Sequence, residues 1–157
     1  MHNASEKGKH VLMNPAPALL IPDSAYHSID TLVMNESEST LMAGDDKTQR
    51  SPEDLAQHFL QKGVKDAVII TLGGDGLVYA TTTTSGRVNA QKVKVVDTTA
   101  AGDTFVGGYA VQRAKHEGGQ FDHKKALEFA TFAASKTVER KGAMAAIPFL
   151  RELAEKQ

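Results

Sequence analysis

The chain has 157 residues, of which 41% are hydrophobic, and its 18 basic and 19 acidic side chains leave a net charge of −1. This composition is typical of one globular domain, and it provides no overall positive field for nucleic acid or an anionic membrane. The chain contains no cysteine, which excludes disulfides, thiolate metal sites and cysteine nucleophiles.

The polar start of the chain leads us to expect no signal peptide. Residues 1–10 are polar and lack the apolar core of a signal peptide. No apolar run approaches the roughly 18 residues that a membrane-spanning helix needs. We therefore expect a cytoplasmic protein with no membrane or nucleic-acid partner.

Short apolar runs and helical patterns alternate in the first third of the chain. The apolar run at 11–13 ends at Asn14-Pro15-Ala16-Pro17, where two prolines stop a strand. The run at 31–34 fits a buried strand, although four residues also fit one helical turn. Residues 36–43 predict a short helix that Gly44 closes.

The next helix has clear start and stop signals. Ser51 suits the N-cap, Pro52 suits the first helical position, and Gly63 ends the pattern. Between them, three apolar residues share one face of the helix: Leu55, Phe59 and Leu60.

The middle of the chain is rich in β-forming residues. Residues 67–72 predict the clearest buried strand, and residues 73–76 turn it into an adjacent strand at 77–81. The threonine run at 81–84, together with Ser85-Gly86, is a β-prone stretch that leads into a turn. Four valines continue the β character: Val88, Val93, Val95 and Val96.

The last third of the chain is predicted to be helical. One helix runs from Asp103 to about 117 and another from about 122 to 140, with Gly118-Gly119 between them. Strands that alternate with helices of this length predict an α/β architecture with a largely parallel sheet.

The strongest chemical signal is Asp-Thr-Thr-Ala-Ala-Gly-Asp-Thr-Phe at 97–105. Small residues at 100–102 lead into a predicted helix, whose first amides are unpaired and favour anions. A phosphate can approach these amides closely, and the Asp103 carboxylate can orient a hydroxyl and accept its proton late in phosphoryl transfer. An ordinary N-cap aspartate after a small-residue turn explains the same letters equally well.

Two weaker motifs follow predicted strands. Thr-Leu-Gly-Gly-Asp-Gly at 71–76 would let a nucleotide lie against backbone, although a plain hairpin turn is the more economical explanation. Asn35-Glu-Ser-Glu38 follows the strand at 31–34, and Glu38 could reach a phosphate-bound magnesium ion directly or through water. Short strings of this kind arise often by chance. No P-loop or dinucleotide fingerprint occurs in the chain.

These motifs are more informative in their order along the chain than they are one by one. The series 14–17, 35–38, 71–76 and 97–105, closed by Arg140-Lys-Gly-Ala, resembles the PfkB carbohydrate kinases and most closely their ribokinase branch. The resemblance covers the chain from Val11 to Pro148.

The resemblance implies a ribokinase-like three-layer αβα sandwich with a largely parallel sheet. Residues 11–157 correspond to the C-terminal, nucleotide-binding half of that domain, after the polar segment 1–10. The glycine-rich sugar motif, the β-sheet lid and the rest of the N-terminal half have no counterpart. The sheet edges that are exposed in such a piece would favour self-association.

The implied activity is ATP-dependent phosphorylation of D-ribose to ribose 5-phosphate, with ATP as co-substrate and with Mg²⁺ and K⁺. Two alternatives stay open. One is a catalytically incomplete ATP-binding fragment, and the other is a PfkB kinase for another sugar or nucleoside.

The resemblance also assigns residues to roles. Asp103 is the catalytic base and contacts the substrate. The anion hole comprises Ala100, Ala101 and Gly102. The nucleotide residues are Asn35, Glu38, Thr71, Leu72, Gly73, Gly74, Asp75, Gly76, Gly102, Asp103 and Thr131. Glu38 also serves magnesium. The monovalent-cation residues are Asp97, Thr99, Thr137, Arg140, Gly142 and Ala146. Ala146 stands where the branch commonly has serine, so one side-chain oxygen is lost there.

Overall fold

The structure is a computed structural model that describes residues 1–44 and 50–153. The chain divides into two compact units, Met1–Arg87 and Val88–Gln157. Each unit has its own local architecture.

The first unit is built on a sheet of five strands in the order β1-β2-β3-β4-β5. Strands β1 (Leu12–Met13), β2 (Thr31–Asn35) and β3 (Ala67–Thr71) run parallel, whereas β4 (Leu77–Thr81) pairs antiparallel with β3. The prediction of a strand at 31–34 is therefore confirmed, and the strand at 67–72 ends one residue earlier than predicted. Every residue of β2 and β3 except the last is buried, as the continuous apolar runs require.

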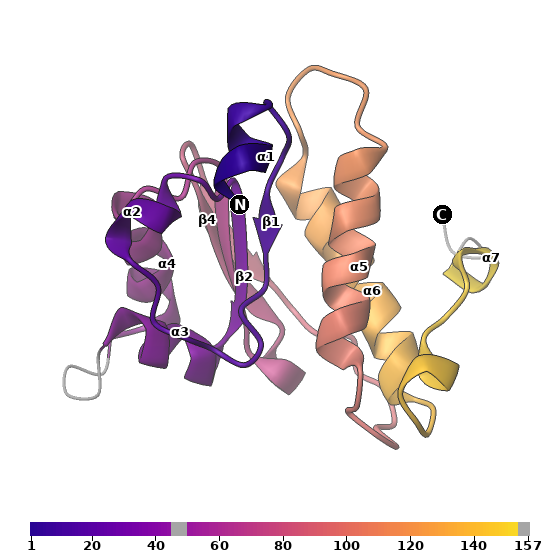
Figure 1. The fold of residues 1–157 in the computed structure, drawn as a ribbon. Coiled ribbons are helices and arrows are strands. Elements are labelled where there is room, and N and C mark those ends of the chain that lie inside the picture. The colour runs from indigo at the N-terminus through magenta and orange to yellow at the C-terminus, as the bar shows by residue number, and fades with distance from the viewer. Residues whose placement is uncertain (45–49, 154–157) are drawn as a thin grey trace. The chain divides into compact units, whose positions relative to one another are not determined.

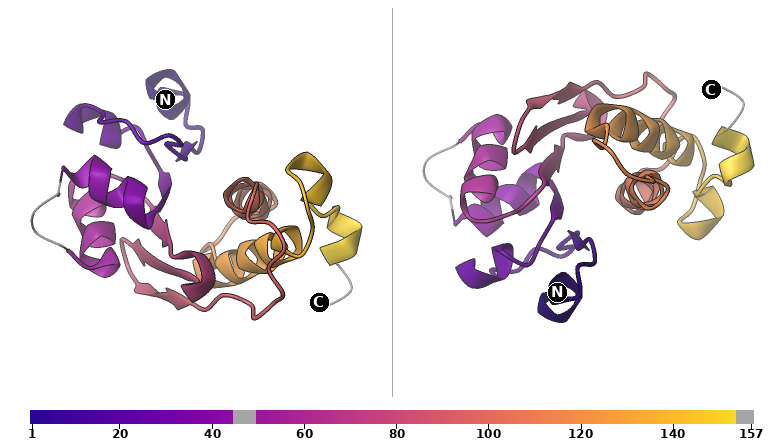
Figure 2. Two further views of the ribbon diagram at one scale, coloured as in Figure 1. Left: turned by 90° about the horizontal axis from the view of Figure 1, so that it is seen from below. Right: turned by 90° about the horizontal axis from the view of Figure 1, so that it is seen from above.

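Helices α3 (Glu36–Ala43) and α4 (Pro52–Gln61) pack on this sheet (Figures 1 and 2). The core between them includes Phe59, Val68 and Ile70, all with no exposed surface. Tyr26, at the end of the short helix α2 (Asp23–Tyr26), packs its ring against Phe59 at 5.6 Å between centroids. A further short helix, α1 (His2–Glu6), lies in the segment predicted only as polar.

The predicted signals at the ends of α3 and α4 are confirmed. Helix α3 ends at Ala43, and Gly44 adopts the left-handed conformation with φ 66°. The Ser51 side chain accepts a hydrogen bond from the Asp54 amide at 3.1 Å, and Pro52 is the first helical residue. Leu55 and Phe59 are buried as predicted, and Leu60 is partly buried against the same core.

Two β predictions are wrong in detail. The stretch 81–86 was predicted to lead into a turn, but it contains the turn itself, at 82–84, and Ser85 and Gly86 begin strand β5 (Ser85–Val88). The Thr81 hydroxyl oxygen sets this turn, because it accepts the amides of Thr83 and Thr84 at 3.2 and 2.9 Å.

The predicted β character ends at Val88. Val93, Val95 and Val96 lie outside the strands, and the Val96 amide donates to the carbonyl of Val138 at 2.7 Å. A β-branched residue takes a strand conformation only where a neighbouring strand can pair with it. Here a helix end provides the hydrogen-bond partner instead.

Helices α5 (Ala101–Ala114) and α6 (His123–Val138) form the body of the second unit (Figure 1). Gly108 lets them approach, since a Cβ there would lie 3.2 Å from the Cα of Ala130. Helix α5 begins two residues earlier and ends three residues earlier than predicted. Helix α6 begins after Asp122, whose side chain accepts the Lys125 amide, and it ends two residues before the predicted boundary.

The short helices η2 (Met144–Ala146) and α7 (Leu150–Leu153) follow α6. None of the helices in the described ranges is both long enough and apolar enough to cross a bilayer.

We expect Ser51→Ala to lower the free energy of unfolding by about 1 kcal/mol, because the Asp54 amide loses its acceptor at the start of α4. Urea unfolding followed by circular dichroism measures this loss. Ser37→Ala, on the exposed first turn of α3, is the matched control and should leave the midpoint nearly unchanged. Equal midpoints for Ser51→Ala and the wild type would contradict the capping role.

Candidate functional site

In the first unit, the candidate residues gather where parallel strands β2 and β3 end. Asn35 is the last residue of β2 and lies in register with Thr71, the last residue of β3. The Thr71 hydroxyl donates to the carbonyl of Met34 at 3.4 Å. The carboxyl ends of parallel strands are where open α/β sheets bind ligands. The structure therefore brings the predicted 35–38 and 71–76 motifs together.

Asn35 and Glu38 form a reciprocal cap on helix α3. The Asn35 side-chain oxygen accepts the Glu38 amide at 2.8 Å, and Glu38 Oε2 accepts the Asn35 amide at 2.8 Å. This capping box satisfies two amides that the helix leaves unpaired. The cap uses one carboxylate oxygen of Glu38 and leaves Oε1 for another partner.

The segment 72–76 is a tight connection between antiparallel strands, so the hairpin explanation of these letters is geometrically correct. Gly73–Asp75 forms the single 3₁₀ turn η1, and the Leu72 amide donates to the Gly76 carbonyl at 2.8 Å. Gly73 and Gly74 are exposed, and a Cβ at either would meet nothing within 4 Å. The backbone of the turn is thus accessible, as contact with a ligand would require.

In the second unit, the segment 97–103 turns sharply onto helix α5. Ala100 is the N-cap residue and adopts a left-handed conformation with φ 62°. The Ala101 amide donates to the Thr98 carbonyl at 3.2 Å. Asp103 is the third helical residue and is exposed, so the N-cap explanation of this aspartate is wrong.

The start of α5 leaves backbone donors open. Gly102 and Asp103 donate their amides to no backbone carbonyl in the described chain. A Cβ at Gly102 would meet nothing within 4 Å, so the approach to these amides is clear. Amides with this freedom, at the positive end of a 14-residue helix, can bind an anion.

Asp97 ties this segment to the chain beyond α6. One carboxylate oxygen accepts the Thr99 hydroxyl at 2.7 Å and the Thr99 amide at 2.9 Å, and the other accepts the Gly142 amide at 3.0 Å. These hydrogen bonds lower the pKa of Asp97 to about 2, and the bond from the Thr99 hydroxyl has the largest effect. The side chain is therefore a carboxylate at all physiological pH values.

The other predicted cation residues surround the end of α6. Thr137 is fully buried, and its carbonyl accepts the Arg140 amide at 3.0 Å. Ala146 is also fully buried, in η2, and has no side-chain oxygen. Asp97 thus contacts both Thr99 and Gly142 directly, and Thr137 and Arg140 lie five and two residues before Gly142 in the chain.

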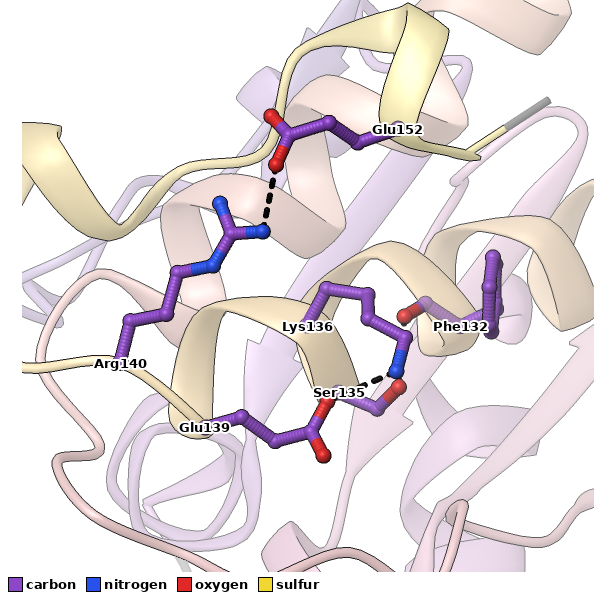
Figure 3. A network of polar contacts seen from close by, with 6 residues as sticks. All are labelled: Phe132, Ser135, Lys136, Glu139, Arg140 and Glu152. Carbon is purple, nitrogen blue, oxygen red and sulfur yellow. Dashed lines mark hydrogen bonds and ion pairs between the residues drawn. The ribbon is translucent and has the colours of Figure 1, made fainter. Parts of the chain in front are cut away.

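The Arg140 side chain is engaged by helix α7. Its guanidinium pairs with Glu152 at 2.5 Å, and next to it Lys136 pairs with Glu139 at 2.7 Å (Figure 3). The bond from Arg140 lowers the pKa of Glu152 below its usual value. The Arg140–Glu152 pair joins α7 to the end of α6, so only the backbone of Arg140 remains for a cation.

Thr131 lies in the middle of α6, apart from the loop residues. It is buried, and its hydroxyl has no hydrogen-bond partner in the part of the chain that the structure describes. A buried unpaired hydroxyl costs stability, so this position stands out within α6. Its predicted contact with adenine remains a prediction.

Sequence reasoning missed Thr104. Its hydroxyl donates to the Ala100 carbonyl at 2.9 Å and accepts the Thr137 hydroxyl at 2.9 Å. One local signal was available: Thr104 lies four residues after Ala100, and a helical threonine can donate its hydroxyl to the carbonyl four residues earlier. The partner on α6 lies 33 residues away and had no sequence signal.

A divalent metal has no preformed cage among residues 1–44 and 50–153, which contain no group of three or more histidine and acidic side chains suited to one. Magnesium commonly binds through one or two carboxylates together with substrate phosphates. The free Oε1 of Glu38 fits that mode, directly or through water.

Over residues 1–150 the chain matches the pfkB family of carbohydrate kinases, and it belongs to that family. It is 40% identical to a ribokinase of Staphylococcus aureus strain COL over 151 residues, which are 96% of this chain and 48% of that protein. The chain thus spans about half the length of the curated relatives it matches.

Solved structures show the same relation. A ribokinase from Thermotoga maritima matches 96% of this chain and 50% of its own, with 33% identity and a TM-score of 0.85. An Arabidopsis thaliana ribokinase complexed with ribose and ATP matches 97% of this chain and 48% of its own, with 28% identity and a TM-score of 0.84. The predicted ribokinase-like αβα fold with a largely parallel sheet is confirmed.

We expect Asp97→Asn to lower the melting temperature at pH 6, because one accepting oxygen becomes an amide donor that faces another donor. The wild-type carboxylate has a pKa of about 2 against an ordinary 3.8, so its contribution is full above pH 3.8 and is lost as the pH falls through 2. The difference between the two melting temperatures should therefore shrink between pH 4 and pH 2.

Glu117→Gln, which alters an exposed carboxyl, is the matched control and should show a small difference throughout. A gap between Asp97→Asn and the wild type that stays constant down to pH 2 would rule out the carboxylate as its source.

Proposed function

We propose that this chain carries the ATP site and the catalytic base of a sugar kinase, and that the sugar is D-ribose, which is phosphorylated to ribose 5-phosphate. The observation that carries the proposal is the start of α5. There, free amides, an open approach and an exposed carboxylate occur on two consecutive residues, Gly102 and Asp103. Membership in a family of carbohydrate kinases supports the same chemistry.

The phosphoryl group would be bound by backbone. The free amides of Gly102 and Asp103 lie at the positive end of α5, where negative charge on the transferring group is stabilised, and Ala101 lies beside them. Ala100 joins them in the proposed anion hole. Such fixed dipoles need no reorganisation when charge develops, which is why they are effective in phosphoryl transfer.

Asp103 would act on the sugar. Its carboxylate accepts the proton of the sugar hydroxyl while the hydroxyl oxygen forms a bond to the γ-phosphorus of ATP. The bond from that phosphorus to the bridging oxygen breaks, and ADP leaves with the electron pair. The side chain is exposed, so a substrate can reach it.

Residues of the first unit would serve the rest of the nucleotide. The accessible backbone of Gly73 and Gly74, in the turn 71–76, suits contact with ATP, and Asn35 with Glu38 suits its phosphates. Glu38 would help to hold the magnesium ion, which neutralises phosphate charge when bound. Thr131 is proposed to contact adenine.

A monovalent cation would be held by oxygens around Asp97. The candidates are the Asp97 carboxylate, the Thr99 oxygens and the backbone carbonyls of Thr137, Arg140, Gly142 and Ala146. The contacts of Asp97 with Thr99 and Gly142 fit this donor set. Such an ion supplies a fixed positive charge beside the anion hole.

The alternative is an ATP-binding chain that lacks transfer activity. The observation that favours it is coverage, because the chain corresponds to 48% of the Staphylococcus aureus ribokinase. Both functions require ATP binding, so sugar-dependent transfer separates them. A preference for another sugar or nucleoside would appear as activity in the same assay.

The test is ribose-dependent ADP formation by the purified chain, with magnesium and potassium, beside Asp103→Asn. We expect the variant to lose at least about 100-fold in rate, the usual contribution of a positioned base, while ATP affinity changes less than twofold. Equal turnover in the variant would remove Asp103 as the base. No turnover in a folded wild-type chain that binds ATP would favour the non-catalytic alternative.

Gly102→Val should weaken ATP binding about tenfold or more, because its side chain occupies the space in front of the proposed phosphate amides. Isothermal titration calorimetry with ATP measures the change. Gly107→Val is the matched control, since Gly107 is on the same helix, is exposed and also has an unobstructed Cβ position. Equal ATP affinity in the two variants would show that phosphate does not approach Gly102.

A further inference from the structure

We propose that Thr104 and Thr137 are positioning residues, which hold the turn at Ala100 so that the amides of Gly102 and Asp103 stay aimed at phosphate. This inference rests on the proposed function, because it assigns the support of the same phosphate site. Neither threonine hydroxyl is proposed to touch the nucleotide.

The support is a chain of two hydrogen bonds between helices. Thr137 of α6 donates its hydroxyl proton to Thr104 Oγ1 at 2.9 Å, and Thr104 donates its own to the Ala100 carbonyl at 2.9 Å. Thr137 has no exposed surface, and Thr104 is 6% exposed. Buried hydroxyls that bond in series strengthen one another and fix the direction of each proton.

The residue held in this way has an unfavourable backbone conformation. Ala100 has φ 62°, the left-handed region, and it is the one non-glycine residue in the described chain with positive φ. That conformation is unfavourable for an alanine, so it persists only where the surroundings enforce it. The Ala100 carbonyl accepts both the Thr104 hydroxyl and the Thr104 amide at 2.9 Å.

The conformation of Ala100 determines where the next amides point. Ala100 is the N-cap residue, and the amides of Ala101, Gly102 and Asp103 follow it directly. If its carbonyl were released, the turn would relax and the free amides of Gly102 and Asp103 would lose their fixed direction. Thr104 thus connects the phosphate amides to the buried end of α6.

A local role alone does not explain Thr137. A threonine in a helix often bonds back to the carbonyl four residues earlier, and Thr104 on its own fits that habit. Thr137, however, reaches Thr104 from a different helix, and the same end of α6 also accepts the Val96 amide through Val138. The end of α6 therefore holds the 96–104 segment from several points.

The test compares ATP and adenosine binding by calorimetry in Thr104→Val, Thr104→Ser, Thr137→Val and Thr137→Ser. Valine keeps the shape of threonine and removes the hydroxyl, whereas serine keeps the hydroxyl. We expect each valine variant to weaken ATP about three- to tenfold, the effect of one lost hydrogen bond, and Thr104→Val to have the larger effect. Adenosine has no phosphates, so its affinity should be the same in all variants and the wild type. The two serine variants, which keep the hydroxyl, should bind ATP as tightly as the wild type.

Ser135→Ala is the matched control. Ser135 is a buried hydroxyl on α6 that donates to the Phe132 carbonyl at 2.7 Å and takes no part in the Thr104 contact (Figure 3). It should leave both affinities unchanged. Ala100→Gly provides a second check, because glycine adopts positive φ without strain and should recover part of the ATP affinity lost in Thr137→Val.

The two proposals fail in different ways. Unchanged ATP affinity in Thr104→Val, parallel loss of adenosine affinity, or no restoration by serine would overturn the positioning role while leaving the ATP site intact. A wild-type chain that binds ATP no more tightly than adenosine would overturn the phosphate site and, with it, the role of these residues in phosphate binding. In that case the ¹³C shifts of Ala100 in wild type and Thr104→Val still show whether the hydroxyls hold its backbone.

Discussion

The carboxylate of Asp97 is the interaction on which the proposed phosphate site depends. It joins Thr99, two residues away, to Gly142, 45 residues away, and so fastens the start of the α5 turn to the chain beyond α6. The buried Thr137–Thr104 bond fastens the other side of the same turn. Between these two attachments lies Ala100, whose left-handed backbone starts the helix that presents the free amides.

In the first unit, the register of two parallel strands brings the candidate residues together. Parallel strands β2 and β3 end in register at Asn35 and Thr71, so their following segments must emerge at one edge of the sheet. The capping box of Asn35 and Glu38 then begins α3 at that edge. In the first unit, the side chains proposed to bind the nucleotide phosphates therefore also satisfy a helix end.

The sequence was most informative where signals are local. The bounds of α3, the cap of α4 and strands β2 and β4 follow from caps, glycines and apolar runs that neighbours in the chain determine. The motif at 97–105 likewise predicted a helix start, which the structure has at Ala101, and its anion site is part of the proposal. The start of α5 was misplaced by two residues, because nothing in the letters of Ala100 shows that it adopts positive φ. The hydrogen bonds from Thr137 to Thr104 and from Gly142 to Asp97 join residues 33 and 45 positions apart. Contacts at such separations produce no periodic pattern in the sequence. Val93, Val95 and Val96 mislead for the same reason, since β propensity does not reveal whether a pairing strand is available.

The most direct measurement is a titration of the ¹⁵N-labelled chain with magnesium-ATP, observed through its backbone amide resonances. The account predicts that the Gly102 and Asp103 amides shift in a saturable way with ATP and stay in place with adenosine. If ATP saturates the chain while these two amides remain unmoved, the start of α5 is not where this protein binds phosphate.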